Sequence, residues 1–110
     1  LYLVRNQSIS ITKGNRNPVG SSLYSAAKAY TSTILSFEAG DKLYLCSDGF
    51  QDQFGGPKDK KFMRKRFKEL LCETSTLDMT EQKTSLDTEF KRWKGDQEQT
   101  DDVLVIGLQL

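Results

Sequence analysis

The sequence predicts an α+β domain in which several antiparallel strands precede two helices and one last strand. Three observations predict this fold class. Apolar residues alternate through much of the first 47 positions, two stripes with helical spacing lie between Asp59 and Gly95, and Val103–Leu110 is almost continuously apolar. Runs of strands followed by helices are typical of layered α+β structures, and 110 residues are enough for one domain.

The strands are expected to form two successive antiparallel pairs. Leu1–Asn6 and Ser8–Ile11 alternate and are close enough in sequence to form a hairpin. Thr31–Phe37 is β-branched and alternating, Glu38–Asp41 is a turn, and Lys42–Ser47 is the next strand. Because short connections usually join neighbouring strands, we expect Thr31–Phe37 to pair with Lys42–Ser47.

Gly, Asn and Pro residues mark Lys13–Ser22 as a loop, and Gly and Pro mark a second loop at Gly55–Pro57. The pattern of Ala26–Tyr30 does not favour one type of secondary structure. The first helix is expected to begin with Asp59 as its cap and to end near Glu73. One face of this helix carries an apolar stripe, made of Met63, Phe67, Leu70 and Leu71.

The second helix is expected to start at Asp78, because Glu81 three residues later completes a capping box, and to stop at Gly95. Its apolar stripe consists of Met79, Leu86, Phe90 and Trp93. Val103–Leu110 is expected to be a central strand buried on both faces.

Composition excludes several functions. The net charge of +1 gives no reason to expect nucleic-acid binding, and no apolar run approaches the roughly 20 residues of a membrane span. With no histidine, sites that need imidazole are excluded from this chain. Cys46 and Cys72 form no CxxC pair, and we expect both to be free thiols, with Cys46 buried and inert. Free thiols suit a reducing compartment, so we expect a cytoplasmic protein.

Acidic residues stand where two apolar strands end and begin. Asp48 follows Lys42–Ser47, and Asp101 and Asp102 precede the last strand. If these strands are antiparallel neighbours, the carboxylates converge, and a divalent cation would relieve their repulsion. Hard oxygen ligands favour Mg²⁺ or Mn²⁺. Gly49 would let the backbone turn beside the metal without an obstructing side chain.

These acids also have simpler interpretations. Asp48-Gly49 is a common turn dipeptide, and Asp101 and Asp102 are acceptable as solvated residues at a strand entry. The basic segment 58–68 contains seven Lys and Arg residues and favours a solvated helix face. Its alternative interpretation is a patch for acidic or phosphorylated partners.

Two motifs resemble a known family. "AGDKLYLCSDGFQDQFGG" and "EQTDDVLVIGLQL" are similar to the last two signature motifs of metal-dependent serine/threonine protein phosphatases of the 2C class. The bacterial sporulation stage II and sigma-factor-regulator branch is the most similar, and "LYLVRNQSISITKGNRNPVG" also resembles its upstream hairpin and loop. The resemblance implies a β-sandwich flanked by helices, with two Mn²⁺ or Mg²⁺ ions at one end.

In this family a metal-activated water hydrolyses phosphoserine or phosphothreonine. The resemblance makes Asp48 and Asp101 metal ligands, and leaves Asp102 as an alternate or outer ligand because many relatives have asparagine there. It implies no catalytic residue beyond the metal ligands. The usual substrates in this branch of the family are phosphorylated anti-sigma-factor antagonists, so the resemblance implies a phosphoprotein substrate of this kind.

One departure limits the resemblance. The other metal ligands of the family lie in an Asp-Gly motif and a GHG-containing segment, and residues 1–110 contain no GHG and no matching Asp-Gly motif. The chain is therefore expected to be the C-terminal part of a phosphatase domain, weak or inactive without the N-terminal half. The alternative is a catalytically silent phosphatase-like module that binds or regulates a protein.

Overall fold

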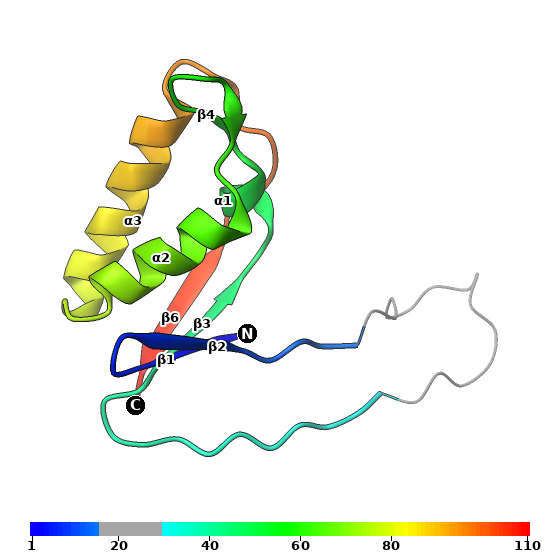
Figure 1. Cartoon of the computed structure of the whole chain (residues 1–110), viewed down its shortest axis with the longest axis vertical. Coiled ribbons are helices and arrows are strands. Elements are labelled where there is room, and N and C mark those ends of the chain that lie inside the picture. Colours follow the sequence, from blue (N-terminus) through cyan, green and yellow to red (C-terminus); the bar gives the residue numbers. More distant parts are fainter. Residues whose placement is uncertain (16–29) are drawn as a thin grey trace.

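The fold centres on a four-stranded antiparallel sheet with two long helices packed on one of its faces (Figure 1). The computed structural model describes residues 1–15 and 30–110. The sheet has the order β2-β1-β3-β6. Its strands in that order are Ser8–Ile11, Tyr2–Arg5, Lys42–Cys46 and Val105–Gln109. The predicted α+β class is confirmed. Most of Lys13–Ser22 and nearly all of Ala26–Tyr30 fall outside the described residues.

The first hairpin forms as predicted. β1 pairs with β2 from Tyr2 opposite Ile11 to Arg5 opposite Ser8. Asn6 and Gln7 connect the strands with φ angles of 48° and 58°. Two positive φ angles in a two-residue connection match the right-handed twist of the strands, so the turn suits the hairpin. Of the two residues, asparagine adopts this conformation more readily than glutamine.

The prediction of a strand at Thr31–Phe37 is wrong. These residues form no strand, and β3 pairs with β1 and β6 instead. Both edges of β3 are therefore occupied, so the segment has no place beside β3. Ile34 is 95% exposed. The turn that follows is confirmed, because the Asp41 N–H donates to the Glu38 carbonyl over 3.1 Å.

The first predicted helix begins later than expected. A short helix, α1 (Gly49–Asp52), and a small hairpin of β4 (Phe54–Gly55) and β5 (Lys60–Lys61) precede α2 (Arg64–Thr74). Asp59 lies in the turn of that hairpin with φ 47° and caps no helix. Met63, at φ 76° and 59% exposed, is the residue before the helix and not part of its buried face.

The second helix is confirmed at both ends. α3 spans Met79–Lys94 and ends at Gly95. The Asp78 side chain accepts from the Glu81 N–H, and the Glu81 side chain accepts from the Asp78 N–H, which completes the capping box. Leu86 and Trp93 of the predicted stripe are buried.

The last strand is not central. β6 pairs only with β3 among the described residues, so it is the edge of the sheet. Ile106 and Leu108 of β6 are exposed, and so are Leu104 and Leu110 on either side of it. The prediction of burial on both faces is wrong because, within residues 1–15 and 30–110, helices cover only one face of the sheet.

An aromatic core fills the space between the helices and the sheet. Phe50 lies at its centre, with ring centroids 4.9 Å from Phe67, 5.1 Å from Phe62 and 5.1 Å from Phe90. Tyr2, Val4 and Tyr44 supply the sheet side of this core. Because Phe50 follows Asp48 by two residues, packing of the core also fixes the backbone at the candidate site.

Candidate metal site

The acids singled out in the sequence lie at one end of the sheet. β3 and β6 are antiparallel, and their last pair is Cys46 opposite Val105. Asp48 follows β3 at this end, and Asp101 and Asp102 precede β6 at the same end. The predicted adjacency of the two strands is therefore confirmed.

Ser47 joins the two strand ends. Its N–H donates to the Leu104 carbonyl over 3.0 Å. Its Oγ accepts from the Leu104 N–H over 2.9 Å and donates to the Asp102 carbonyl over 2.8 Å. The hydroxyl thus continues the ladder where backbone pairing stops, and fixes Asp102 beside the residues around Asp48.

Gly49 allows this close approach. A Cβ at this position would lie 2.3 Å from the Asp102 carbonyl oxygen and 3.1 Å from a Val103 methyl carbon. The φ angle of Gly49 is not positive. The reason for glycine is therefore the space beside β6 rather than the sharp turn that the sequence suggested.

The side chain of Asp48 is available for a ligand. Asp48 is exposed at the N-cap of α1, where its carboxylate makes no capping hydrogen bond, and its backbone carbonyl accepts from the Asp52 N–H over 3.0 Å. Among the described residues it has no ion-pair partner.

Asp101 and Asp102 are also exposed. One carboxylate oxygen of Asp101 accepts from the Asp102 N–H over 2.7 Å, which holds the side chain against its own backbone. Residues 1–15 and 30–110 contain no group of three or more acidic, Cys or His side chains arranged to hold a metal. The structure thus gathers the backbones at one end but not a complete ligand set.

A polar cleft of about 480 Å³ opens beside Asp48. Polar side chains in its lining belong to Thr12, Lys13, Ser47, Gln51 and Arg64, whereas Asp101 and Asp102 do not line it. Burial raises the pKa of the Cys46 thiol at its edge, which agrees with the inert thiol that the sequence predicts. Lys13 and Arg64 were missed in the sequence, because neither the loop that holds Lys13 nor the basic segment that holds Arg64 indicates which cation faces a cleft.

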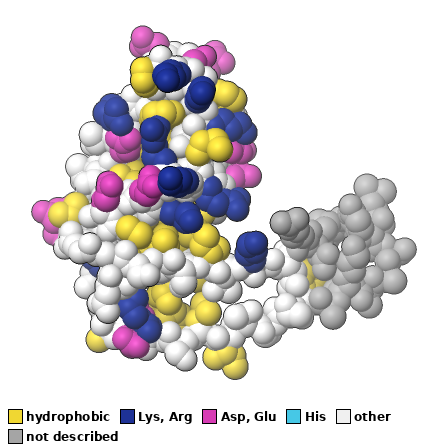
Figure 2. Space-filling view, in the orientation of Figure 1, with side chains coloured by type: hydrophobic (Ala, Val, Ile, Leu, Met, Phe, Trp, Pro, Cys, Tyr) yellow, Lys and Arg dark blue, Asp and Glu magenta, His cyan; other side chains and the backbone are white. Residues whose placement is uncertain are grey.

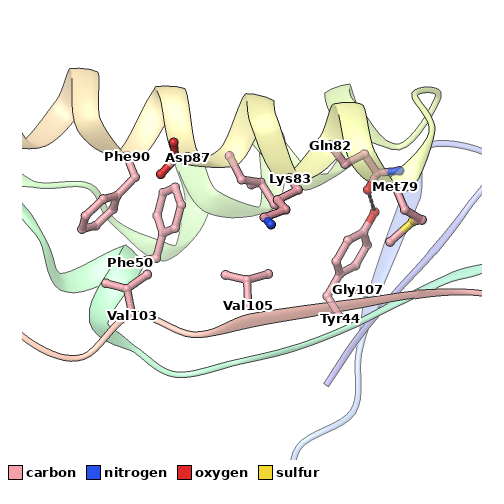
Figure 3. A pocket seen from close by; sticks show the side chains of 11 residues that line it. Tyr44, Phe50, Met79, Gln82, Lys83, Asp87, Phe90, Val103, Val105 and Gly107 are labelled. Carbon is pink, nitrogen blue, oxygen red and sulfur yellow. Dashed lines mark hydrogen bonds between the residues drawn. The ribbon is translucent and has the colours of Figure 1, made fainter.

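A second cavity, of about 270 Å³, lies beneath α3 (Figure 3). Apolar side chains such as Phe50, Phe90 and Val105 line it, and the Tyr44 hydroxyl donates to the Gln82 amide oxygen over 2.6 Å. Burial raises the pKa of Tyr44 to about 12. The ionisable residues in its lining are Lys83, Asp87 and the hydrogen-bonded Tyr44, and the other lining residues are mostly apolar. We therefore assign this cavity to packing.

Comparison with solved structures identifies the fold. The chain is similar to the SiaA-PP2C domain of Pseudomonas aeruginosa, with a TM-score of 0.85 and 24% identity. The match covers 99% of this chain and 42% of that chain. The fold is thus that of part of a PP2C-type phosphatase domain.

Comparison with family models gives the family. The model described as stage II sporulation protein E (SpoIIE) matches residues 1–110, so this chain belongs to the SpoIIE family of PP2C-type phosphatases. The resemblance found in the sequence is therefore confirmed. A search of curated proteins gave no match. Among the residues that the structure describes, no helix has the length and apolar character needed to cross a membrane.

Proposed function

We propose that this chain contributes Asp48 and Asp101 to a Mn²⁺ or Mg²⁺ site of a phosphatase that hydrolyses phosphoserine or phosphothreonine on a regulatory phosphoprotein. The observation that supports it best is the β3–β6 register, which brings the two acidic segments to one end of the sheet. Membership of the SpoIIE family supports the reaction class.

The residues present fit part of such a site. Carboxylate oxygens are the ligands that Mg²⁺ and Mn²⁺ prefer, and Asp48 and Asp101 are both exposed. The described residues contain no group of three or more acidic, Cys or His side chains that could hold a metal ion. We therefore propose that the remaining ligands, and the strands that would complete the sandwich, come from an N-terminal half of the same domain, and that this chain alone has weak or no activity.

Each residue of the site has a separate part in this proposal. Asp48 and Asp101 would hold the cation, with Asp102 as an alternate or outer ligand. Ser47 keeps the two segments in register through its bonds to Asp102 and Leu104. A bound divalent cation would polarise phosphate oxygens and lower the pKa of water. As substrates of this phosphatase we propose phosphorylated anti-sigma-factor antagonists, with the reaction taking place in the cytoplasm.

A catalytically silent, protein-binding module is the second candidate. The absence of a three-residue ligand group among residues 1–15 and 30–110 favours it. The two candidates differ in one measurable property, because a silent module would bind its partner without binding Mn²⁺ even in the full-length protein.

The test uses the full-length protein that contains this chain. Mn²⁺ binding is measured by calorimetry, and hydrolysis is measured with a phosphoserine peptide. Asp48→Asn and Asp101→Asn are expected to lower hydrolysis by about 100-fold or more and to weaken Mn²⁺ binding, because each removes a charged ligand. Asp96→Asn, an exposed acid in the same loop, is the matched control. Unchanged hydrolysis in both ligand variants would refute the proposed site.

A further inference from the structure

Two cations in the cleft beside Asp48 have no part in the proposed metal site. Arg64 is the first residue of α2, and Lys13 follows β2 by two positions. Both are exposed and line the cleft of about 480 Å³ together with Asp48. Figure 2 shows Lys and Arg side chains over the middle and upper parts of the molecule, where α2, α3 and the β4–β5 hairpin lie.

Arg64 is held to the helix that follows Asp48. Its Nε donates to the Gln51 side-chain oxygen over 3.3 Å. The Met63 N–H donates to the Gln51 backbone carbonyl over 2.8 Å. Gln51 belongs to α1, whose N-cap is Asp48, so the guanidinium and the candidate metal ligand are positioned by the same short helix.

Arg64 differs from the other described arginines in its partners. Arg5 pairs with Asp41 and Glu38, and Arg92 pairs with Glu89. Arg66 lies over the Trp93 ring, 4.2 Å from its centroid. Arg64 has neither a carboxylate nor an aromatic ring as a partner among residues 1–15 and 30–110, so its two terminal nitrogens remain available to a ligand.

The chemistry of this arrangement suits a phosphate group. A guanidinium presents paired N–H donors that match two oxygens of a phosphate monoester. Lys13 adds a second positive charge to the same cleft. The N-cap of α2 also has no side-chain hydrogen bond, so the first-turn amides near Arg64 lack the capping partner that many helices have.

We propose that the cleft is a phosphate-binding subsite in which Arg64 holds oxygens of the substrate phosphate monoester and Lys13 adds charge. The inference rests on the proposed function, and it names residues of this chain that recognise the substrate of that site. Arg64 acts as a binding residue, and Gln51 as the positioning residue that orients it.

The experiment compares Arg64→Gln and Arg64→Lys in the full-length protein with Mn²⁺ and para-nitrophenyl phosphate. Arg64→Gln is expected to raise KM about 10-fold, since a charge-assisted hydrogen bond is lost, with a kcat that changes by less than about threefold. Inhibition by inorganic phosphate should weaken by a similar factor. The KM of Arg64→Lys should lie between those of the wild type and Arg64→Gln, because lysine keeps the charge but not the paired donors.

Lys65→Gln is the matched control. It removes one positive charge from the next residue, whose side chain lines a different groove near Trp93. Its KM and phosphate inhibition are expected to stay within about twofold of the wild type. If Arg64→Gln gives the same values as Lys65→Gln, the phosphate subsite is refuted while the metal site stands.

Calorimetry with inorganic phosphate separates this inference from the proposed function. If the wild type shows no hydrolysis, the proposed function fails, but phosphate binding that weakens about 10-fold in Arg64→Gln still supports the subsite. Phosphate binding that is absent, or equal in both proteins, overturns it. Circular dichroism of each variant confirms that the exposed substitution leaves the fold intact.

Discussion

Gly49 lies so close to the backbone carbonyl of Asp102 that no side chain fits between α1 and the segment that leads into β6. This contact joins two segments separated by more than 50 positions, and it lies at the end of the sheet where the candidate ligands are. Its consequences can be measured.

Gly49→Ala should destabilise the protein. A Cβ would lie 2.3 Å from the Asp102 oxygen, so one of the two segments must move. Forced overpacking of this kind costs about 1–3 kcal/mol of unfolding free energy, and urea denaturation measures it. Gly14→Ala, where a Cβ meets nothing within 4 Å, is the control. Equal unfolding midpoints for the two variants would contradict the tight contact.

The Arg5–Asp41 ion pair should make stability depend on acid pH. The hydrogen bond from Arg5 lowers the pKa of Asp41 to about 2, and the Glu38 N–H also donates to this carboxylate. The folded pKa is below the unfolded value of about 3.9. The stabilisation is therefore present above about pH 4 and is lost as pH falls toward 2.

Urea unfolding of wild type and Asp41→Asn between pH 2 and pH 6 tests this dependence. The stability difference between the two proteins should shrink as the pH is lowered. Glu38→Gln is the control. The Glu38 carboxylate also pairs with Arg5, but 67% of the Glu38 side chain is exposed. A difference that stays constant over this range would show that the Asp41 charge is not the cause.

Gln53→Leu should loosen the loop that leads to Asp101. The buried Gln53 amide donates to the carbonyls of Phe54 and Glu98 and accepts from the Thr100 N–H. Leucine is similar in size but leaves these groups without partners, at a cost of about 1–3 kcal/mol. Urea denaturation measures the loss, and weaker Mn²⁺ binding by the full-length variant would link the loop to the site. Gln97→Leu, exposed in the same loop, should have little effect.

Asp78→Ala should weaken α3. The substitution removes the side chain that accepts from the Glu81 N–H and breaks the capping box. Loss of such a cap costs about 1 kcal/mol, visible as a lower thermal midpoint. Thr76→Ala, exposed two residues earlier, is the comparison. Equal midpoints would mean that packing alone sets the start of α3.

Local signals in the sequence predicted local structure well. Asp78 and Glu81 identify the start of α3 because both partners of the capping box lie within one turn. Asp59 was also expected to cap a helix but lies in the β4–β5 turn, because pairing of Phe54 with Lys61 removes these residues from the helix. The conflict could not be resolved from sequence, since it depends on which backbone partners are available in three dimensions.

Predictions that depended on neighbouring strands were less successful. The alternation in Thr31–Phe37 indicates a strand but not whether β3 has a free edge. For the site, the meeting of the segments that hold Asp48 and Asp101 was conditional on β3 and β6 being antiparallel neighbours, and the pairing of these strands meets that condition. Arg64 could not be identified because its position depends on Gln51 and on the late start of α2.

The edge position of β6 gives each of its amide protons one of two environments. The N–H groups of Leu104 and Leu110 donate toward the β3 side, to Ser47 and Asp41, so alternation directs those of Val105, Gly107 and Gln109 outward. In deuterated water the outward three should exchange fast and the others slowly. Slow exchange at all positions in the full-length protein would reveal another strand along that edge, without a need for its coordinates.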